Sequence, residues 1–393
     1  MFYVGIDIAK RSHEAAVIDD KGMVSVKPFS FSNTIEGCQK VLAALTKINA
    51  PKDEVIVAME ATGHYWLNVY SFFIEYGFDV KVVNPIQSDS FRDLSIRKCK
   101  TDSIDCVLIA ELIRFGKYSS CTVPDETLVA IKNLSRYRFF IVDSCADLKR
   151  KAICLLDQVF PEYDSLFSDI FGITSRELLM KFTIPEEFLD VSATKLTKFI
   201  AKTSKGRLGR SKAEQIQSAA QNSFGLKYAT ESFTFQLRMI LEQINFAENQ
   251  LTELNREIER LLESVGGIIL TTITGFGSTL AAAVFGELGE ISKFDSPKKI
   301  VAYAGIDASV AQSGQFIGTQ GKISKRGSPY LRRALYLAAN IAAFKDPALS
   351  VYYANKIAQG KHHKQAVLAV ARKLCNIIWA VWNSKKPYEP HSN

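Results

Sequence analysis

Apolar and polar positions alternate in short runs over the first part of the chain, and this pattern predicts a mixed α/β sheet. Three strand-like runs come first, and the Asp19–Gly22 segment between the second and the third has the composition of a tight turn. Those two runs are therefore expected to pair as an antiparallel hairpin. The expected strands are Phe2–Asp7, Glu14–Ile18, Met23–Phe29, Val55–Met59 and Val80–Val83, and the expected helices are Thr34–Leu45 and one that starts at Tyr65.

From about Leu134 the apolar residues recur at steps of three and four, which predicts two long helices. Pro161 should end the first and Gly266–Gly267 the second. The apolar rows of the two helices, called seams here, could pack against each other as an antiparallel pair, form a dimer interface or pack inside one bundle. The stretch 162–227 between them is interpreted as an irregular insertion with a basic patch from Lys202 to Lys212. The seams are Ile141, Cys145, Leu148, Ala152, Leu155 and Val159, and Ile240, Ile244, Ala247, Leu251, Leu254, Ile258, Leu261 and Val265.

The 393 residues, 47% of them hydrophobic, are enough for two or three domains. We expect a sheet domain over 1–125, the long helices with the insertion over 126–265, and a C-terminal domain over 266–393. No apolar stretch is long enough to span a bilayer and no secretory signal is visible, so a cytoplasmic protein without a membrane partner is expected. The seven cysteines are scattered without zinc-binding spacing and are expected to be reduced. The net charge of +8 permits a polyanionic partner without requiring one.

Four acidic residues stand where buried elements begin or end. Asp7 interrupts the apolar end of the first strand, and Glu60 follows the strand Val55–Met59 directly. Asp102 and Asp105 lie three residues apart at a helix start, which places both carboxylates on one face. Each acid alone has an ordinary explanation: Asp102 as a helix N-cap, Glu60 as a strand-end charge, and Asp7 as a partner of Lys10.

Together, the four acids are harder to explain by structure alone, because a buried carboxylate is unfavourable unless a cation compensates it. Their hard oxygen donors suit Mg²⁺ or Mn²⁺. Two such ions about 4 Å apart would hold the attacking and leaving oxygens of a phosphodiester.

The C-terminal part carries a second candidate site. Gly275 and Gly277 form a Gly-x-Gly turn before a helix of small residues, which could bring backbone N–H groups close to a phosphate; a helix C-cap explains one glycine equally well. Ser313 precedes a basic block, and no Asp or Glu occurs from Ala308 to Lys345, which favours a nucleic-acid groove over an ordinary solvated face. The block consists of Lys322, Lys325, Arg326, Arg332 and Arg333, with Tyr330 among them.

These segments together resemble the DEDD insertion-sequence transposases related to Piv-type DNA invertases. The segments that carry the resemblance are Gly5–Lys10, Glu60–Tyr65, Lys100–Asp105, Gly275–Gly277, Ser313–Gly314 and Lys322–Arg332. They span both ends of the chain. The resemblance implies a RuvC-like (ribonuclease-H-like) α/β domain, a helical coiled-coil region, and a mainly α C-terminal transposase domain with a helix-hairpin-helix.

The resemblance also implies a chemistry. Asp7, Glu60, Asp102 and Asp105 would bind Mg²⁺ or Mn²⁺, and Ser313 would attack DNA to form a phosphoserine link. The partners implied are DNA, a structured bridge RNA that pairs with donor and target DNA, and further copies of the chain in a dimer or tetramer.

Two other functions remain open from the residues. A metal-only RuvC-like nuclease or junction resolvase would use water as its nucleophile and would need Ser313 only for structure. An ATP-binding protein of the actin and sugar-kinase type also opens with an Asp on its first strand. That class needs a Gly-rich phosphate loop after the strand, and Ala9–His13 contains no glycine.

Overall fold

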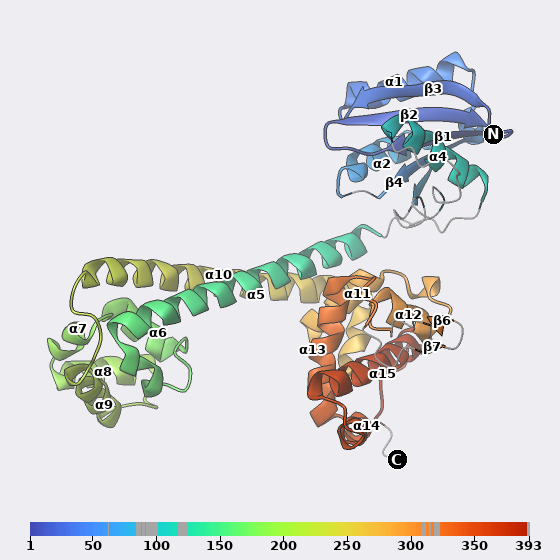
Figure 1. Ribbon diagram of the computed structural model, residues 1–393. Coiled ribbons are helices and arrows are strands. Elements are labelled where there is room, and N and C mark those ends of the chain that lie inside the picture. The colour runs from blue at the N-terminus through green and yellow to red at the C-terminus, as the bar shows by residue number, and fades with distance from the viewer. Residues whose placement is uncertain are drawn as a thin grey trace. The chain divides into compact units, whose positions relative to one another are not determined.

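The computed structural model describes residues 1–61, 63–83, 88, 91, 101–116, 125–307, 312–313, 316–317 and 323–390 (Figure 1). The chain divides into two compact units, Met1–Val123 and Pro124–Asn393. The first unit contains the sheet. The second is mainly helical.

The first unit is built on a five-stranded sheet in the order β3-β2-β1-β4-β5. β1 pairs antiparallel with β2 and parallel with β4, so an antiparallel opening is followed by parallel units, as the sequence predicted. The strands are β1 (Phe2–Asp7), β2 (Ser12–Asp19), β3 (Val24–Ser32), β4 (Val55–Glu60) and β5 (Asp79–Val83). The helices are α1 (Ile35–Lys47), η1 (Lys52–Glu54), α2 (Trp66–Glu75) and α4 (Asp102–Arg114).

Helices cover both faces of this sheet, because side chains along each strand alternate between the faces. Val4 and Ile6 belong to the core that β1 shares with α1 and α2. On the opposite face, Ala58 and Val83 pack against Ile109 of α4. Residues of β1 with odd numbers therefore face α4.

The second unit is organised around two long antiparallel helices, α5 (Glu126–Val159) and α10 (Thr230–Ser264), which lie side by side in Figure 1. Lys149 forms an ion pair with Glu248, and Arg138 donates a hydrogen bond to the side chain of Asn255. These contacts show that the two helices run in opposite directions. The two predicted seams are buried or half-buried inside the chain. α5 ends at Val159 and α10 at Ser264, each two residues before the predicted Pro161 and Gly266.

The stretch 162–227 is helical, so the expectation that it is irregular was wrong. Its segments are short, which hid their period, but they pack with parts of α5 and α10 around one core that includes Phe188, Leu196 and Ile216. Pro185 and Ser192 begin two of the helices. The elements are η2 (Pro161–Leu166), α6 (Ile173–Lys181), α7 (Pro185–Leu189), α8 (Ala193–Thr203) and α9 (Arg210–Gln221).

The last part of the chain packs at the other end of the long helices, around the buried helix α11. Its elements are η3 (Gly267–Thr272), α11 (Ser278–Leu288), η4 (Ile291–Lys293), α12 (Pro297–Tyr303), β6 (Gln312–Ser313), β7 (Phe316–Ile317), α13 (Pro329–Lys345), α14 (Pro347–Ala358) and α15 (His363–Ser384). Among the described residues, α15 is the one helix whose length and composition would allow a membrane span. It buries Val367, Val370 and Leu374 in this core, as a core helix does.

Candidate functional site

Three acidic side chains gather at one edge of the sheet, on the face that α4 covers. Asp7 ends β1, and its register partner on β2 is Glu14. Gly5 pairs with Ala58 on β4, so Glu60 lies beside Asp7 and on the same face. Strand pairing alone therefore brings three carboxylates together.

Helix α4 adds two more acids because Gly5 lets it approach the sheet closely. A Cβ at Gly5 would lie 1.9 Å from the backbone oxygen of Cys106 and 2.6 Å from the backbone nitrogen of Ala110. Only a residue without a side chain fits between β1 and α4 at this point. The first turn of the helix then places exposed Asp102 and buried Asp105 near the strand ends.

The electrostatics of Asp7 show that the acids converge. Burial has the largest effect on the Asp7 carboxyl, and with the charges of Asp102, Asp105 and Glu60, in that order, it raises the pKa of Asp7 to about 6. Asp7 forms no ion pair with Lys10 among the described contacts. We call Asp7, Glu14, Glu60, Asp102 and Asp105 the acidic cluster.

Hydrogen bonds hold two members of the acidic cluster in place. Glu60 accepts a hydrogen bond of 2.7 Å from the buried Ser88 hydroxyl. Glu14 accepts one of 3.4 Å from Ser103 on α4. Burial also raises the pKa of the neighbouring Cys106 thiol to about 12, and Glu14 and Asp7 contribute, so this thiol is uncharged at neutral pH.

The donor set suits a hard divalent cation, since every charged donor in the cluster is a carboxylate oxygen. A cation there would also relieve the repulsion that raises the pKa of Asp7. In the parts of the chain that the structure describes, no three His, Cys, Asp or Glu side chains close into a coordination group. The acids therefore lie near one another, but the described side chains do not form a coordination group.

Sequence reasoning missed Glu14. It lies at the start of a predicted strand and is followed by the apolar residues Ala15, Ala16 and Val17. The signal was the hairpin register, because an antiparallel return from Asp7 sets Glu14 opposite it.

Ser313 lies in the second unit, at the end of a short strand. Its backbone pairs with Phe316 in the two-stranded β6–β7 ribbon. The four predicted metal ligands are thus brought together in one unit, and the predicted nucleophile belongs to the other.

The Gly-x-Gly turn has a structural reason for its first glycine. Gly275 has a positive φ of 97°, and a Cβ there would lie 2.3 Å from the backbone oxygen of Ala338 on α13. Gly277 is exposed and precedes the first turn of α11, with nothing within 4 Å of an added Cβ. Gly277 is therefore exposed at the N-terminus of α11, whereas Gly275 lets this turn approach α13 closely.

The basic block divides into paired and exposed residues. Arg333 forms two hydrogen bonds, of 2.7 and 2.6 Å, with Asp143 on α5, and its guanidinium lies over the Phe139 ring. Arg332 donates to the backbone oxygen of Ala304 at 3.0 Å. Lys325 and Arg326 are exposed in the loop before α13. Lys322 lies outside the described residues.

Comparison with known proteins connects both regions to one family. A family model described as a transposase matches residues 4–161, and a second, described as transposase of the IS116/IS110/IS902 family, matches residues 268–354. The first range contains the acidic cluster and the second contains Ser313. The chain belongs to the IS110/IS116 family of transposases.

Relatives of this transposase match it over nearly its full length. The pilin gene-inverting protein of Moraxella bovis is 25% identical over 98% of this chain and 97% of its own. An uncharacterized protein of insertion element IS116 from Streptomyces clavuligerus is 22% identical over 99% of this chain and 96% of its own. The RuvC structure from Thermus thermophilus aligns with 30% of this chain and 99% of its own, at 16% identity and a TM-score of 0.23.

Proposed function

We propose that the transposase cuts and rejoins DNA by using the acidic cluster to hold Mg²⁺ or Mn²⁺ and Ser313 as its nucleophile. The observation that carries this proposal is the gathering of Asp102, Asp105 and Glu60 around a partly buried Asp7, whose pKa is raised to about 6 by burial first and by these three charges next. Like charges gathered at a partly buried position favour a bound cation. The ligands proposed for it are Asp7, Glu60, Asp102 and Asp105.

The chemistry requires a bond exchange at phosphorus. The Ser313 hydroxyl oxygen would form a bond to phosphorus as the bond to the leaving deoxyribose oxygen breaks, and the serine proton would pass through solvent to that oxygen. A bound divalent cation would supply charge neutralisation and activation of the attacking oxygen. Rejoining reverses the exchange: a deoxyribose hydroxyl attacks the phosphoserine and restores the Ser313 hydroxyl.

Phosphate contacts would come from the exposed parts of the second unit. Gly277 at the start of α11, with Lys325 and Arg326, is proposed to bind DNA backbone, and Lys322 is included on the sequence alone. Three other residues of the predicted site would instead hold the surrounding structure in place: Gly275 through its close approach to Ala338, Arg332 through Ala304, and Arg333 through Asp143.

Substitution of Ser313 by alanine separates this function from that of a metal-only nuclease. With Mg²⁺ and DNA from the element's ends, wild type should form a covalent protein–DNA adduct visible on a denaturing gel. Ser313→Ala should lose adduct and cleavage while it binds metal as before. Ser350→Ala, a change in α14, serves as the matched control. Unchanged cleavage by Ser313→Ala would support water as nucleophile and overturn the serine mechanism.

We further propose, from the family resemblance, that the protein binds a bridge RNA and works as a dimer or tetramer. The same resemblance suggests that α5 and α10 form a coiled coil and that the C-terminal domain contains a helix-hairpin-helix. Sequencing the RNA that copurifies with the protein tests whether it binds a bridge RNA. One enriched structured RNA is expected. A sample without any enriched structured RNA would contradict guided targeting.

A further inference from the structure

Helices α6 to α9 form a helical module at the far end of the long helices from α11 (Figure 1). Neither family model covers it, since one ends at residue 161 and the other begins at 268. Arg176 pairs with Glu248 of α10, and Arg238 of α10 pairs with Glu187. Buried Tyr163 also bonds to Ser175. The module is thus folded and is held against the long helices by these ion pairs.

Charge is divided unevenly within this module. From Val191 to Ala213 the chain has seven Lys and Arg residues and no Asp or Glu. Arg210 pairs with Glu214, and Lys212 donates to the backbone oxygen of Leu166. The other five form no ion pair among the described contacts and are exposed: Lys195, Lys198, Lys202, Lys205 and Arg207.

Helix α8 presents three of these cations on one face. Lys195, Lys198 and Lys202 follow a spacing of three and four residues, which sets them within about 60° of one another around the helix axis. Leu196 and Ile200 are buried on another side of the helix. The row spans about 10 Å, close to the rise of three nucleotides along one strand of a duplex.

The turn after α8 extends this row. Ser204 is buried and caps the turn, accepting from the backbone nitrogen of Leu208 at 3.0 Å. Lys205 and Gly206 both have positive φ, 54° and 79°, so the chain reverses sharply and leaves Lys205 and Arg207 exposed. Lys181 adds a further exposed cation, 4.8 Å from the centre of the Phe199 ring of α8. We call these six residues the basic face: Lys181, Lys195, Lys198, Lys202, Lys205 and Arg207.

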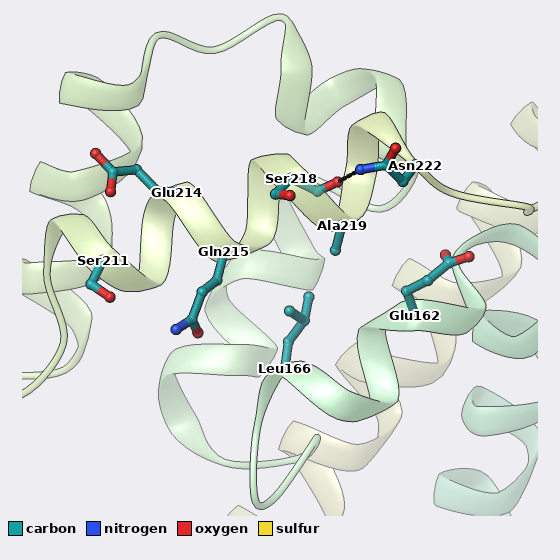
Figure 2. Close-up of a pocket in the computed structure, with 8 residues that line it drawn as sticks. All are labelled: Glu162, Leu166, Ser211, Glu214, Gln215, Ser218, Ala219 and Asn222. Carbon is teal, nitrogen blue, oxygen red and sulfur yellow. Dashed lines mark hydrogen bonds between the residues drawn. The ribbon is translucent and has the colours of Figure 1, made fainter.

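Two acids of the module, Glu162 and Glu214, line a depression formed by η2 and α9. Figure 2 shows a shallow depression between α9 and η2, with Glu214 at one end and Glu162 at the other. Glu162 is held there by bonds from the Ser223 hydroxyl and the Phe224 backbone nitrogen. Glu187 is paired with Arg238, and among the described contacts no carboxylate forms an ion pair with the lysine row of α8.

We propose that the basic face binds the phosphodiester backbone of a nucleic acid at a position separate from the acidic cluster. Unpaired cations in a row complement a polyanion with regular charge spacing. A membrane surface fits less well, because α8 exposes none of the large apolar side chains that anchor a helix in a bilayer interface.

Binding to the metal-free full-length chain tests this proposal independently of cleavage. Short random-sequence duplex DNA, duplex RNA and single-stranded RNA, each fluorescently labelled, would be titrated in EDTA at several salt concentrations. The double variant Lys198→Gln/Lys202→Gln should lose about tenfold in affinity for at least one of them, and the salt slope should fall by about 2. The nucleic acid that shows the loss identifies the ligand.

Two control variants complete the test. Lys151→Gln/Arg256→Gln removes the same charge from exposed positions on α5 and α10 and should keep both affinity and slope. Lys198→Arg/Lys202→Arg should bind as wild type, since backbone contacts need the charge. Equal losses in the patch and control variants would overturn the proposal. An arginine variant that binds these nucleic acids more weakly than wild type would also overturn it.

Discussion

The acidic cluster at the end of β1 and the basic face of α8 both gather charges of one sign, but they differ in burial. Asp7 and Asp105 lie in or near the packed layer between sheet and helix, and the pKa of Asp7 is raised to about 6. The lysines of α8 project into water, where repulsion between exposed charges is weak. Partly buried like charges therefore indicate a bound cation and chemistry, whereas exposed like charges indicate a surface for binding.

The largest effect is expected at Gly5, which sets how close α4 comes to the acids. Gly5→Ala puts a methyl group against the backbone of Cys106 and Ala110, so α4 must shift. Unfolding free energy, measured by urea denaturation, should fall by about 3 kcal/mol, and cleavage should be lost. Gly209→Ala, where an added Cβ meets nothing within 4 Å, is the control and should cost no more than about 1 kcal/mol, the loss of a glycine N-cap on α9. A stable, active Gly5→Ala protein would contradict the tight packing that assembles the cluster.

Removal of the Asp7 charge should stabilise the metal-free protein. The pKa of Asp7 in the folded state lies above its ordinary 3.8, so the folded form binds the extra proton and stability falls as pH rises from about 4 to about 6. Above that range Asp7 is charged and unfavourable. Asp7→Asn should therefore raise the unfolding free energy at pH 7.5 by about 1–2 kcal/mol, after allowance for solvent screening.

Thermal denaturation in EDTA at pH 4, 6 and 7.5 checks this pH dependence, with the gap between Asp7→Asn and wild type expected to widen as pH rises. Added Mg²⁺ should stabilise wild type more than the variant. A gap that stays constant with pH would show that burial and the acidic neighbours do not raise the pKa of Asp7.

Glu14 sharpens the boundary of the acidic cluster. Because it lies opposite Asp7 and bonds to Ser103, Glu14→Gln should weaken divalent-cation affinity by about tenfold while folding is kept. Calorimetric titration with Mn²⁺ measures this. Glu75→Gln on α2, across the sheet from the cluster, should bind Mn²⁺ as wild type does. If both variants bind alike, Glu14 does not belong to the site.

The smallest effect on stability is expected on the basic face. Lys198→Gln removes an exposed, unpaired cation, so the unfolding free energy should change by less than about 0.5 kcal/mol. Urea denaturation provides the value. A large destabilisation would mean that Lys198 has a structural role and would weaken the contrast with Asp7.

Much of the first unit could be predicted because its signals are local. Alternating apolar residues defined the strands of the sheet, and Asp7 and Glu60 were visible as acids at their ends. The spacing of Asp102 and Asp105 set them in the first turn of α4, as the structure shows. Glu14 was missed because its place depends on pairing across a turn.

The second unit was harder to predict because its decisive contacts are distant in sequence. Arg333 was interpreted as part of a nucleic-acid groove, yet its partner Asp143 lies on α5. Gly275 gave the pattern of a phosphate turn, but its close contact is the backbone of Ala338. Residues 162–227 fold into short helices whose core forms only when they pack together, so no single segment revealed the module.

Cation binding by the metal-free protein tests most directly whether the acidic cluster is the metal site. Mn²⁺ would be titrated calorimetrically into wild type and into Glu60→Gln, which loses the charge but keeps an oxygen that can accept from Ser88. Wild type is predicted to bind saturably, and Glu60→Gln at least about tenfold more weakly. Equal binding by the two proteins, or no binding by wild type, would contradict a metal site at the ends of β1 and β4.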